Sequence, residues 1–365
     1  MSALDRITIK GFKSIREQEI ELKPLNVLIG ANGAGKSNLI AVFRLLHQII
    51  AGSLQLYVGR QGGAATLLHQ GPKVTDELEI SAWFGMNSYR CRLLPTQTKR
   101  FVFGEEVVAF HDSDNYEKPL EYQLGVGHEE TRLEEPGKHE RIAGYVLKAI
   151  RSWQIYHFHD TSESARLKQL GDLHDNRFLR PDGANLAAYL YLLQRTEKAY
   201  YRNIVDTIRM VAPFFAGFQL EPSRDNRRKI ELTWQERGSD AYFNAHALSD
   251  GTLRFICLTT LLRQPPANLP TTILLDEPEL GLHPFAINLL IDMLRSAACH
   301  TQLIVATQST TLVNQLEPKE ILVVDRVDGE SAFRRLGEEE VAGWLDDYSL
   351  GELWEKNVFG GRPAA

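Results

Sequence analysis

An eight-residue segment, GANGAGKS at Gly30–Ser37, has the residue types and spacing that bind the phosphates of a nucleotide. It matches the phosphate-loop pattern G-x-x-x-x-G-K-[ST] at every fixed position. An accidental match to four fixed positions is rare, on the order of one in a hundred chains of this length. The alternative is a glycine-rich turn that only joins a strand to a helix. We predict nucleotide binding at this segment.

Two adjacent carboxylates, Asp276 and Glu277, follow a short apolar run. Such a run predicts a buried strand, and carboxylates at its end suit Mg²⁺ chemistry on phosphates. Asp276 can hold the metal directly or through water, while Glu277 can accept a proton from an attacking water. The alternative is a strand-end turn with two solvated carboxylates, which the upstream phosphate loop disfavours.

A third candidate is the segment ALSDGTLR, which precedes an apolar helix that runs through Leu262. This order places Ser249 and Gly251 at the N-terminus of the helix. Backbone N–H groups and the helix dipole at such an end attract anions. The segment therefore predicts a second contact with phosphate.

Two further clusters have competing interpretations. Phe12 and Lys13 lie in the turn GFKS before the phosphate loop, so they either approach a bound nucleotide or serve as a core aromatic and a solvated lysine. His157, His159 and Asp160 suggest a metal site, but no other segment supplies ligands at a matching spacing. We therefore disfavour a histidine-based metal site.

Basic and aromatic clusters indicate surfaces rather than catalysis. The densest basic cluster consists of Arg224, Arg227, Arg228 and Lys229. It either contacts phosphate backbones or forms a solvated hairpin tip, and the solvated tip is favoured. The acidic tail carries aromatic and apolar side chains at Trp344, Tyr348, Leu350, Trp354 and Phe359. These dock on the same chain or, as a second interpretation, on a partner.

The composition is that of an ordinary globular chain. Its 365 residues suggest about two domains, and 43% hydrophobic residues can bury a substantial core. The net charge of -6 gives no global attraction to nucleic acid. We interpret the three scattered cysteines as buried thiols in a reducing compartment. Because no targeting segment or membrane span is recognisable, we expect a cytoplasmic protein without membrane partners.

The elements that must position these residues alternate between strand and helix. The pattern predicts strands at Leu25–Ile29, Thr271–Pro278, Thr301–Thr307 and Ile321–Asp325, and helices from Lys36 and over Pro284–Ala298. It also predicts helices at Arg141–Ile150, Gly183–Thr196 and Tyr201–Val211, and antiparallel strands at Glu77–Phe84, Tyr89–Leu94 and Phe101–Phe110. We expect His111–Glu140 to be a surface loop, Phe218–Leu220 and Lys229–Trp234 to form a hairpin, and Asp328-Gly329 to be a hairpin turn. The alternation predicts an α/β fold with a mostly parallel sheet.

The motifs in this order resemble the ATP-binding-cassette ATPase heads of the RecF, SMC and OLD groups. The resemblance covers nearly the whole chain and rests on IKGFKSI, GANGAGKSN, LSDGTLR, ILLDEPELGLHP, IVATQS and YSLGELWEKNVFGG. It implies a P-loop NTPase of the ABC-ATPase head type, with a mostly parallel sheet, an antiparallel β subdomain and an inserted helical lobe. The implied domains are a split ATPase core at residues 1–135 and 250–365, and a mainly helical lobe at residues 136–249. Related bacterial AAA-type predicted ATPases occur in DNA repair and anti-phage defence operons.

The resemblance also implies a role for each matched residue. Lys36 contacts the β and γ phosphates, Ser37 and Asp276 coordinate Mg²⁺, and Glu277 is the general base. The ATP-binding set is Gly30, Asn32, Gly33, Ala34, Gly35, Lys36, Ser37, Asn38, Phe12, Lys13 and Gln308. Ser249, Asp250 and Gly251 form a signature that reaches the γ-phosphate bound to a second subunit. A head-to-tail homodimer with two sandwiched ATP molecules follows from this arrangement.

Several positions depart from the family pattern. Asp250 replaces a glycine and adds a negative charge near a triphosphate, and Gln308 stands where many cassette ATPases have a switch histidine. His283 occupies the usual position of the D-loop aspartate, and Gln154 is a Q-loop candidate by location only. We therefore expect slow hydrolysis.

Three hypotheses follow for the function. The first is a Mg²⁺-dependent ATPase whose ATP-bound dimer acts as a switch on DNA or on a separately encoded effector protein. The second is a largely non-hydrolysing ATP-binding sensor subunit of a toxin or nuclease complex. The third is a P-loop kinase, in which Ser249 has no role. We find no nuclease constellation in the sequence itself.

Overall fold

The computed structural model describes residues 3–362, which divide into two compact units. Unit 1 combines Met1–Trp153 with Glu317–Ala365, and unit 2 is Gln154–Leu316. These boundaries differ from those of the predicted domains, because residues 136–153 belong to unit 1 and residues 250–316 to unit 2. The units are defined by compactness and the domains by motifs, so the domain assignment stays a prediction.

An antiparallel sheet of six strands forms one part of unit 1, in the order β2-β1-β4-β5-β6-β7. Its strands are β1 (Arg6–Phe12), β2 (Ile15–Glu21), β4 (Leu78–Phe84), β5 (Asn87–Pro95), β6 (Phe101–Phe110) and β7 (Leu120–Gly125). The predicted antiparallel subdomain is therefore confirmed. The predicted loop over His111–Glu140 is wrong in part, since it contains β7. This edge strand buries only Leu124 and pairs with β6 through its backbone, so its sequence carries little strand signal.

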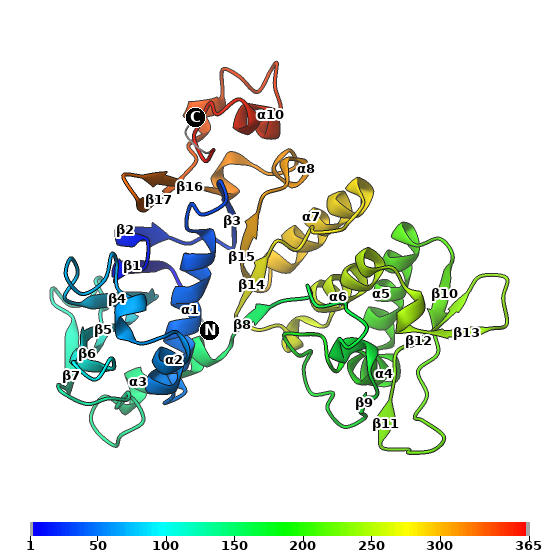
Figure 1. Cartoon of the computed structure of the whole chain (residues 1–365), viewed down its shortest axis with the longest axis horizontal. Helices are drawn as coiled ribbons and strands as arrows, with labels where there is room; N and C mark the ends of the chain where they lie inside the picture. Colours follow the sequence, from blue (N-terminus) through cyan, green and yellow to red (C-terminus); the bar gives the residue numbers. More distant parts are fainter. Residues whose placement is uncertain (1–2, 363–365) are drawn as a thin grey trace. The chain divides into compact units, whose positions relative to one another are not determined.

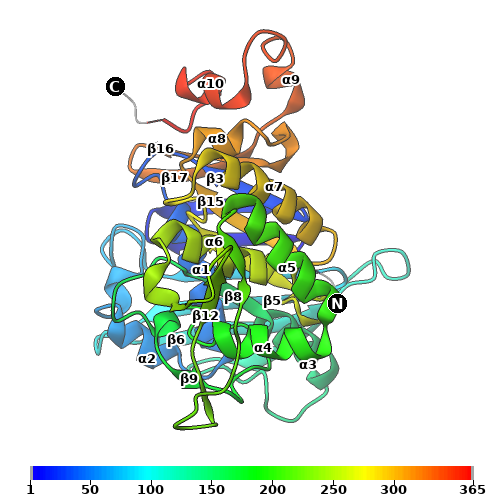
Figure 2. The same cartoon turned by 90° about the vertical axis from the view of Figure 1, so that its right-hand side faces the viewer.

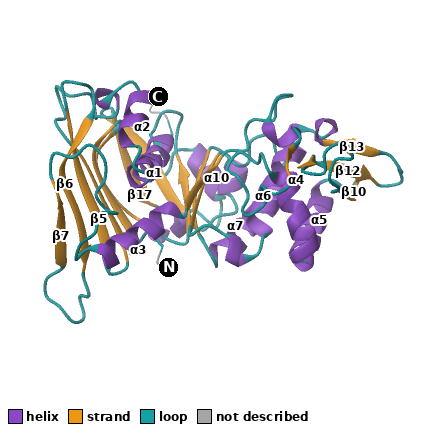
Figure 3. Cartoon of the chain, turned by 90° about the horizontal axis from the view of Figure 1, so that it is seen from below, coloured by secondary structure: helices purple, strands orange, loops and turns teal. Residues whose placement is uncertain are grey.

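Three helices cover one face of this sheet (Figure 3). They are α1 (Lys36–Ile50), α2 (Leu54–Arg60) and α3 (Glu140–Arg151). The predicted apolar stripe of α1 is confirmed, since Leu39, Phe43, Leu46 and Ile50 are all buried. Phe43 packs on Trp153 with ring centroids 4.9 Å apart. This packing fixes the helix that begins at the phosphate loop.

The second sheet region of unit 1 combines a strand from the N-terminal part of the chain with strands from its C-terminal part (Figure 1). Strand β3 (Leu25–Ile29) is buried throughout and runs parallel to β16 (Ile321–Val327). Strand β17 (Glu330–Arg335) returns antiparallel to β16. Asp328 and Gly329, both with positive φ, form the turn between them, which confirms the predicted hairpin.

The C-terminal tail packs against this hairpin. It contains the short helices α9 (Glu338–Val341) and α10 (Leu350–Glu355). Leu353, Trp354 and Phe359 are buried, and the N–H of Gly361 donates to Asp325 Oδ1 at 2.6 Å. Trp344 keeps 48% of its surface exposed. The tail therefore docks on its own unit and still presents an aromatic side chain to solvent.

Unit 2 contains a parallel strand pair and a group of packed helices (Figure 2). Strand β14 (Thr272–Asp276) pairs with β15 (Gln302–Thr307) so that Asp276 lies opposite Ala306. The helices are α4 (Leu186–Thr196), α5 (Lys198–Val211), α6 (Asp250–Arg263), α7 (Pro284–Ala298) and α8 (Thr310–Val313). Successive helices from α4 to α8 pack on one another, and α7 also packs on β15. The bounds of α7 are those predicted from the sequence.

The remaining strands of unit 2 form two small sheets. They are β9 (Gly171–Asp172), β10 (Phe215–Phe218), β11 (Lys229–Ile230), β12 (Thr233–Glu236) and β13 (Tyr242–Asn244). Strand β8 (Trp153–Tyr156) begins at the unit boundary and belongs to neither of these two sheets. The predicted hairpin is only partly right, because β10 pairs with β12 whereas β11 pairs with β9. Arg224, Arg227 and Arg228 are exposed in the intervening loop, as the solvated-tip interpretation requires.

The cysteines differ from the prediction at one position. Cys91 and Cys257 are buried, and burial raises the pKa of Cys257 to about 12. Cys299 is exposed, so the prediction of three buried thiols is wrong there. It caps the C-terminus of α7, where the apolar periodicity of the helix ends. Within residues 3–362 no helix is both long and apolar enough to cross a membrane.

Candidate nucleotide site

The phosphate loop connects β3 to the first turn of α1. Gly33 and Gly35 have φ values of 78° and 123°, a region that side chains with a Cβ avoid. Gly35 is the N-cap of α1, and the first turn of that helix contains no acidic residue. The first N–H groups of a helix have no intrahelical acceptor, and the dipole is positive there. Strand, loop and helix therefore form the anion-binding geometry that the motif predicts.

The hairpin of β16 and β17 packs closely against this loop. A Cβ on Gly30 would lie 2.3 Å from the carbonyl oxygen of Val324, and one on Gly35 would lie 2.0 Å from Ser331 Oγ. Ser331 Oγ also donates to the carbonyl of Ala34 at 2.5 Å. Packing therefore requires glycine at both positions, and at Gly35 the positive φ requires it as well.

A chain of short hydrogen bonds extends from Ser331 to the first helix. Its hydroxyl lies 2.6 Å from Ser14 Oγ, which accepts a hydrogen bond from Asn38 Nδ2 at 2.6 Å. Arg326 Nη1 donates to the carbonyl of Gly33 at 3.0 Å. Ser14, Ser331 and Arg326 were not predicted as site residues. No local signal marks them, because two of them lie about 300 residues from the loop they hold.

Lys36 is only 6% exposed, and its ammonium group lies against its own loop. Nζ donates to the carbonyl of Gly30 at 2.6 Å and to that of Ala31 at 3.1 Å. Asn32, Gly33 and Ser37 are exposed at the rim, whereas Ala34 is buried. The loop therefore presents backbone and hydroxyl groups to solvent and holds its cation behind them.

Phe12 and Lys13 occupy different environments. Phe12 is fully buried and bridges to Leu68, so it belongs to the core and has no surface for a nucleotide in this conformation. Lys13 has a φ of 49°. Burial, together with the nearby charge of Arg44, lowers the pKa of Lys13. The core interpretation holds for Phe12, and a nucleotide contact by Lys13 stays a prediction.

The two candidate carboxylates lie at the carboxyl end of β14 in unit 2. The N–H of Glu277 donates to the carbonyl of Ala306 at 2.8 Å, and Glu277 has a positive φ of 44°. Gln308 Nε2 donates to Glu277 Oε1. The structure therefore joins Glu277 to Gln308, two residues predicted from separate motifs.

Sequence reasoning missed the neighbouring Glu279. Glu279 is 9% exposed, and its Oε1 accepts hydrogen bonds from Thr307 Oγ1 at 2.5 Å and from the N–H of Gln308 at 3.3 Å. Burial raises the pKa of Glu279, and the hydrogen bonds from Thr307 and Gln308 oppose part of this shift. The only sequence signal is a second acidic residue two positions after Glu277.

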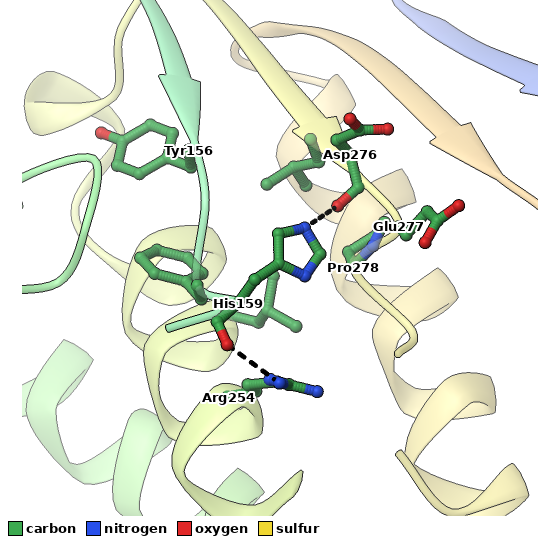
Figure 4. A pocket seen from close by; sticks show the side chains of 9 residues that line it. Tyr156, His159, Arg254, Asp276, Glu277 and Pro278 are labelled. Carbon is green, nitrogen blue, oxygen red and sulfur yellow. Dashed lines mark hydrogen bonds between the residues drawn. The ribbon is translucent and has the colours of Figure 1, made fainter. Parts of the chain in front are cut away.

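A small pocket adjoins these carboxylates (Figure 4). His159 Nε2 donates to the carbonyl of Asp276 at 2.9 Å, and Arg254 Nη2 donates to the carbonyl of His159 at 3.0 Å. Arg254 Nη1 donates to the carbonyl of Leu280 at 2.9 Å. The cavity of about 10 Å³ has room for roughly one water molecule. The side chains of His159 and Arg254 thus fix the backbone around Asp276. The pocket that they line is too small for a nucleotide.

This arrangement also bears on the suggested metal cluster. His159 is occupied by a backbone carbonyl of Asp276. Among residues 3–362 no three His, Cys, Asp or Glu side chains are grouped to hold a metal ion. His157, His159 and Asp160 are therefore not brought together as such a group in the described part of the chain.

The predicted signature lies at the start of α6. Ser249 is the N-cap, and its Oγ accepts from the N–H of Thr252 at 3.2 Å. A Cβ on Gly251 would lie 2.3 Å from the carbonyl oxygen of Gly281. Asp250 Oδ1 lies 3.9 Å from Lys168 Nζ, so a cation faces the extra charge at this position. His283 caps α7 by accepting from the N–H of Phe285 at 3.3 Å.

Comparisons with known proteins agree with this architecture. Residues 25–314 match the family described as "AAA domain, putative AbiEii toxin, Type IV TA system". A comparison with curated protein sequences finds no match. The chain resembles a solved Smc head bound to the C-winged helix domain of ScpA, with 17% identity, a TM-score of 0.63 and coverage of 93% of this chain and 99% of that one.

Two further Smc heads are also similar in structure. The head with an extended coiled coil from Pyrococcus furiosus, bound to the C-terminal domain of ScpA, has 16% identity, a TM-score of 0.60 and coverage of 95% and 99%. The head with a coiled coil and joint from Pyrococcus yayanosii has 14% identity, a TM-score of 0.55 and coverage of 95% and 99%. At these identities the likeness establishes the fold, which is the predicted P-loop fold of the ABC-ATPase head.

The chain thus has the fold of an Smc ATPase head, and its phosphate loop and its match to an AAA domain place it among nucleotide-binding proteins. The chain belongs to the AAA-domain family of the putative AbiEii toxin group.

The glycines of the loop provide a local test of this geometry. We expect Gly35→Ala to lower both the free energy of unfolding and ATP affinity by more than Gly33→Ala does. Both substitutions strain a positive φ, at a cost of about 1–2 kcal/mol. Only Gly35→Ala also collides with Ser331, because nothing lies within 4 Å of a Cβ on Gly33. Urea denaturation and nucleotide titration measure the difference. Equal losses in the two variants would contradict the packing argument.

Proposed function

We propose that this chain binds ATP with Mg²⁺, hydrolyses it slowly, and pairs with a second copy when ATP is bound. The observation that carries the proposal is the side chain of Glu277, held by Gln308 at the carboxyl end of a parallel strand. A carboxylate fixed in this way in a P-loop ATPase is suited to orient an attacking water and to accept its proton.

The nucleotide contacts follow from the chemistry of each group. Backbone N–H groups from Gly30 to Gly35 would bind phosphate oxygens, and Lys36 would move its hydrogen bonds from carbonyl groups to the β and γ phosphates. Asn32 lies within the loop and Asn38 follows it, although Asn38 already donates to Ser14. The side-chain amide of Gln308 binds Glu277, so we expect Gln308 to lie near the γ-phosphate together with the proposed general base.

Magnesium fits the donor set that the chain offers. The hydroxyl of Ser37 is exposed, and Asp276 ends a buried strand. Mg²⁺ prefers oxygen ligands and usually takes one or two from protein, with phosphates and water completing its shell. Ser37 and Asp276 would hold the ion, which would neutralise charge on the β and γ phosphates.

In the hydrolysis step, Glu277 would accept a proton as water oxygen bonds to the γ-phosphorus. The bond from that phosphorus to the bridging oxygen breaks, and ADP leaves with the electron pair. Gln308 keeps one carboxylate oxygen of Glu277 occupied. The other oxygen can then receive the proton.

The signature supports pairing with a second ATP-bound copy. Ser249 and Gly251 are at the N-terminus of the 14-residue helix α6, where the dipole favours a γ-phosphate. Asp250 opposes that attraction, and Lys168 at 3.9 Å offsets it in part. Because Asp250 weakens the attraction of the helix dipole, we expect the contact between the two copies to be reversible and to depend on bound nucleotide.

A second candidate function is a sensor subunit that holds ATP and hardly hydrolyses it. The exposed Trp344 favours it, since an aromatic side chain on an acidic tail can bind a separately encoded effector. The exposed Arg224, Arg227 and Arg228 form a second surface, to which the phosphates of DNA would bind. DNA repair and anti-phage defence are the settings in which such a switch would act.

Phosphate release by the purified chain tests the proposed function. We expect slow release that requires Mg²⁺ and that stops when EDTA removes the ion. Ser249→Arg should lower release, because it blocks the contact with the second copy. Turnover that continues in EDTA would contradict the metal assignment. Undiminished turnover in Ser249→Arg would favour a P-loop kinase-like site without pairing, and ATP binding without turnover would favour the sensor.

A further inference from the structure

We propose that Glu279 is a positioning residue for ATP hydrolysis, whose buried carboxyl fixes Gln308 and thereby orients Glu277. The proposal rests on the proposed function, because it assigns a supporting group to the proposed general base. Glu279 lies two residues after that base, in the segment that leads from β14 to α7.

Glu279 binds the end of the neighbouring strand at two points. One oxygen, Oε1, accepts both the hydroxyl of Thr307 at 2.5 Å and the N–H of Gln308 at 3.3 Å. Thr307 is fully buried at the end of β15. The carboxyl therefore sets where β15 ends and where the side chain of Gln308 begins.

Gln308 transmits this placement to Glu277. Its backbone is held by Glu279, and its side-chain amide donates to Glu277 Oε1. A neutral amide donor can orient a carboxylate. A lysine or arginine in its place would carry a full positive charge, which would make the carboxylate a weaker base. Glu277 also has a positive φ of 44°, a conformation that persists in a non-glycine residue only where the surroundings enforce it.

The chemistry of Glu279 argues for a role beyond holding two loops together. Glu279 is 9% exposed, so its carboxyl is costly to ionise, and burial raises its pKa. Its second oxygen, Oε2, is buried without a hydrogen-bond partner among the described residues. A buried carboxyl with a shifted pKa beside other titratable groups is characteristic of a functional site.

Steady-state kinetics on the full chain separate positioning from structure. We expect Glu279→Ala to lower kcat on the order of tenfold to a hundredfold while ATP affinity is unchanged, because a misplacement of about 1 Å costs that much in rate. Glu279→Gln keeps an oxygen of the same reach and should restore most of kcat. Asp292→Ala removes an exposed carboxylate from α7 and is the matched control.

A double-mutant cycle tests the route through Gln308. If Glu279 acts through this residue, Glu279→Ala should have little further effect on kcat in a Gln308→Ala background. Additive losses would overturn the proposal. Thermal denaturation of each variant confirms that folding is retained, and a Glu279→Ala chain that fails to fold is replaced by Thr307→Val, which removes one of the two donors.

Hydrogen exchange supplies a readout that does not need turnover. The Gln308 amide should exchange faster in Glu279→Ala than in wild type or Asp292→Ala, measured on peptides that span residues 303–312. Unchanged exchange would overturn the positioning contact even if ATP is hydrolysed. Faster exchange with unchanged kcat would show a structural role only. A wild-type chain that binds but does not hydrolyse ATP would contradict the proposed function, whatever the exchange result.

Discussion

Glu277→Gln should lower ATP turnover by about 10²–10⁴-fold, because the amide cannot accept the proton from the attacking water. ATP binding should survive, since the substitution leaves the phosphate loop and Lys36 intact. A chain that binds ATP without consuming it should accumulate as the paired state. In saturating ATP and Mg²⁺, light scattering should then report twice the 41.3 kDa of one chain.

Two controls make this result specific. The double variant Glu277→Gln with Lys36→Ala should remain a monomer, because pairing requires bound nucleotide. Glu277→Gln with Ser249→Arg should bind ATP as a monomer, because the signature cannot reach the second copy. A monomer of Glu277→Gln in saturating ATP would count against the sandwiched dimer. Wild-type turnover in the same variant would show that Glu277 is not the base.

Lys36→Ala should weaken ATP binding by at least tenfold to a hundredfold, as expected for loss of charge-assisted hydrogen bonds of about 1.5–3 kcal/mol. The same change removes the donor for the carbonyl groups of Gly30 and Ala31, which Nζ contacts at 2.6 and 3.1 Å. We therefore also expect a loss of unfolding free energy in the absence of nucleotide. Calorimetric titration with ATP and urea denaturation measure the two effects.

Lys10→Ala is the matched control for this experiment. Lys10 lies in β1 of the same unit and forms a solvent-exposed ion pair with Glu17. Exposed pairs contribute little, about 0–1 kcal/mol, so ATP affinity should be unchanged. Full ATP affinity in Lys36→Ala would refute the assignment of the phosphate loop, and equal losses in both variants would indicate a non-specific charge effect.

Local sequence was sufficient for the parts of the site that a short segment can encode. The phosphate loop needs a strand, glycines with positive φ and a helix start, and all of them lie between Leu25 and Ile50. The carboxylates of β14, the N-cap at Ser249 and the start of α7 at Pro284 are equally local. Hydrophobic period, capping and turn chemistry act over a few residues, so they can be read without a fold.

Tertiary structure decided which side chains support those motifs. Ser331 and Arg326 reach the loop because β16 pairs with β3 in a particular register. This register cannot be predicted from a short segment of sequence. Glu279 and Gln308 meet because β14 and β15 end side by side. Phe12 was a site candidate by proximity in sequence, but packing buries it completely. The sequence by itself thus determined the phosphate-loop motif and the acidic strand end, because both are local, while long-range pairing of strands decided which side chains hold them.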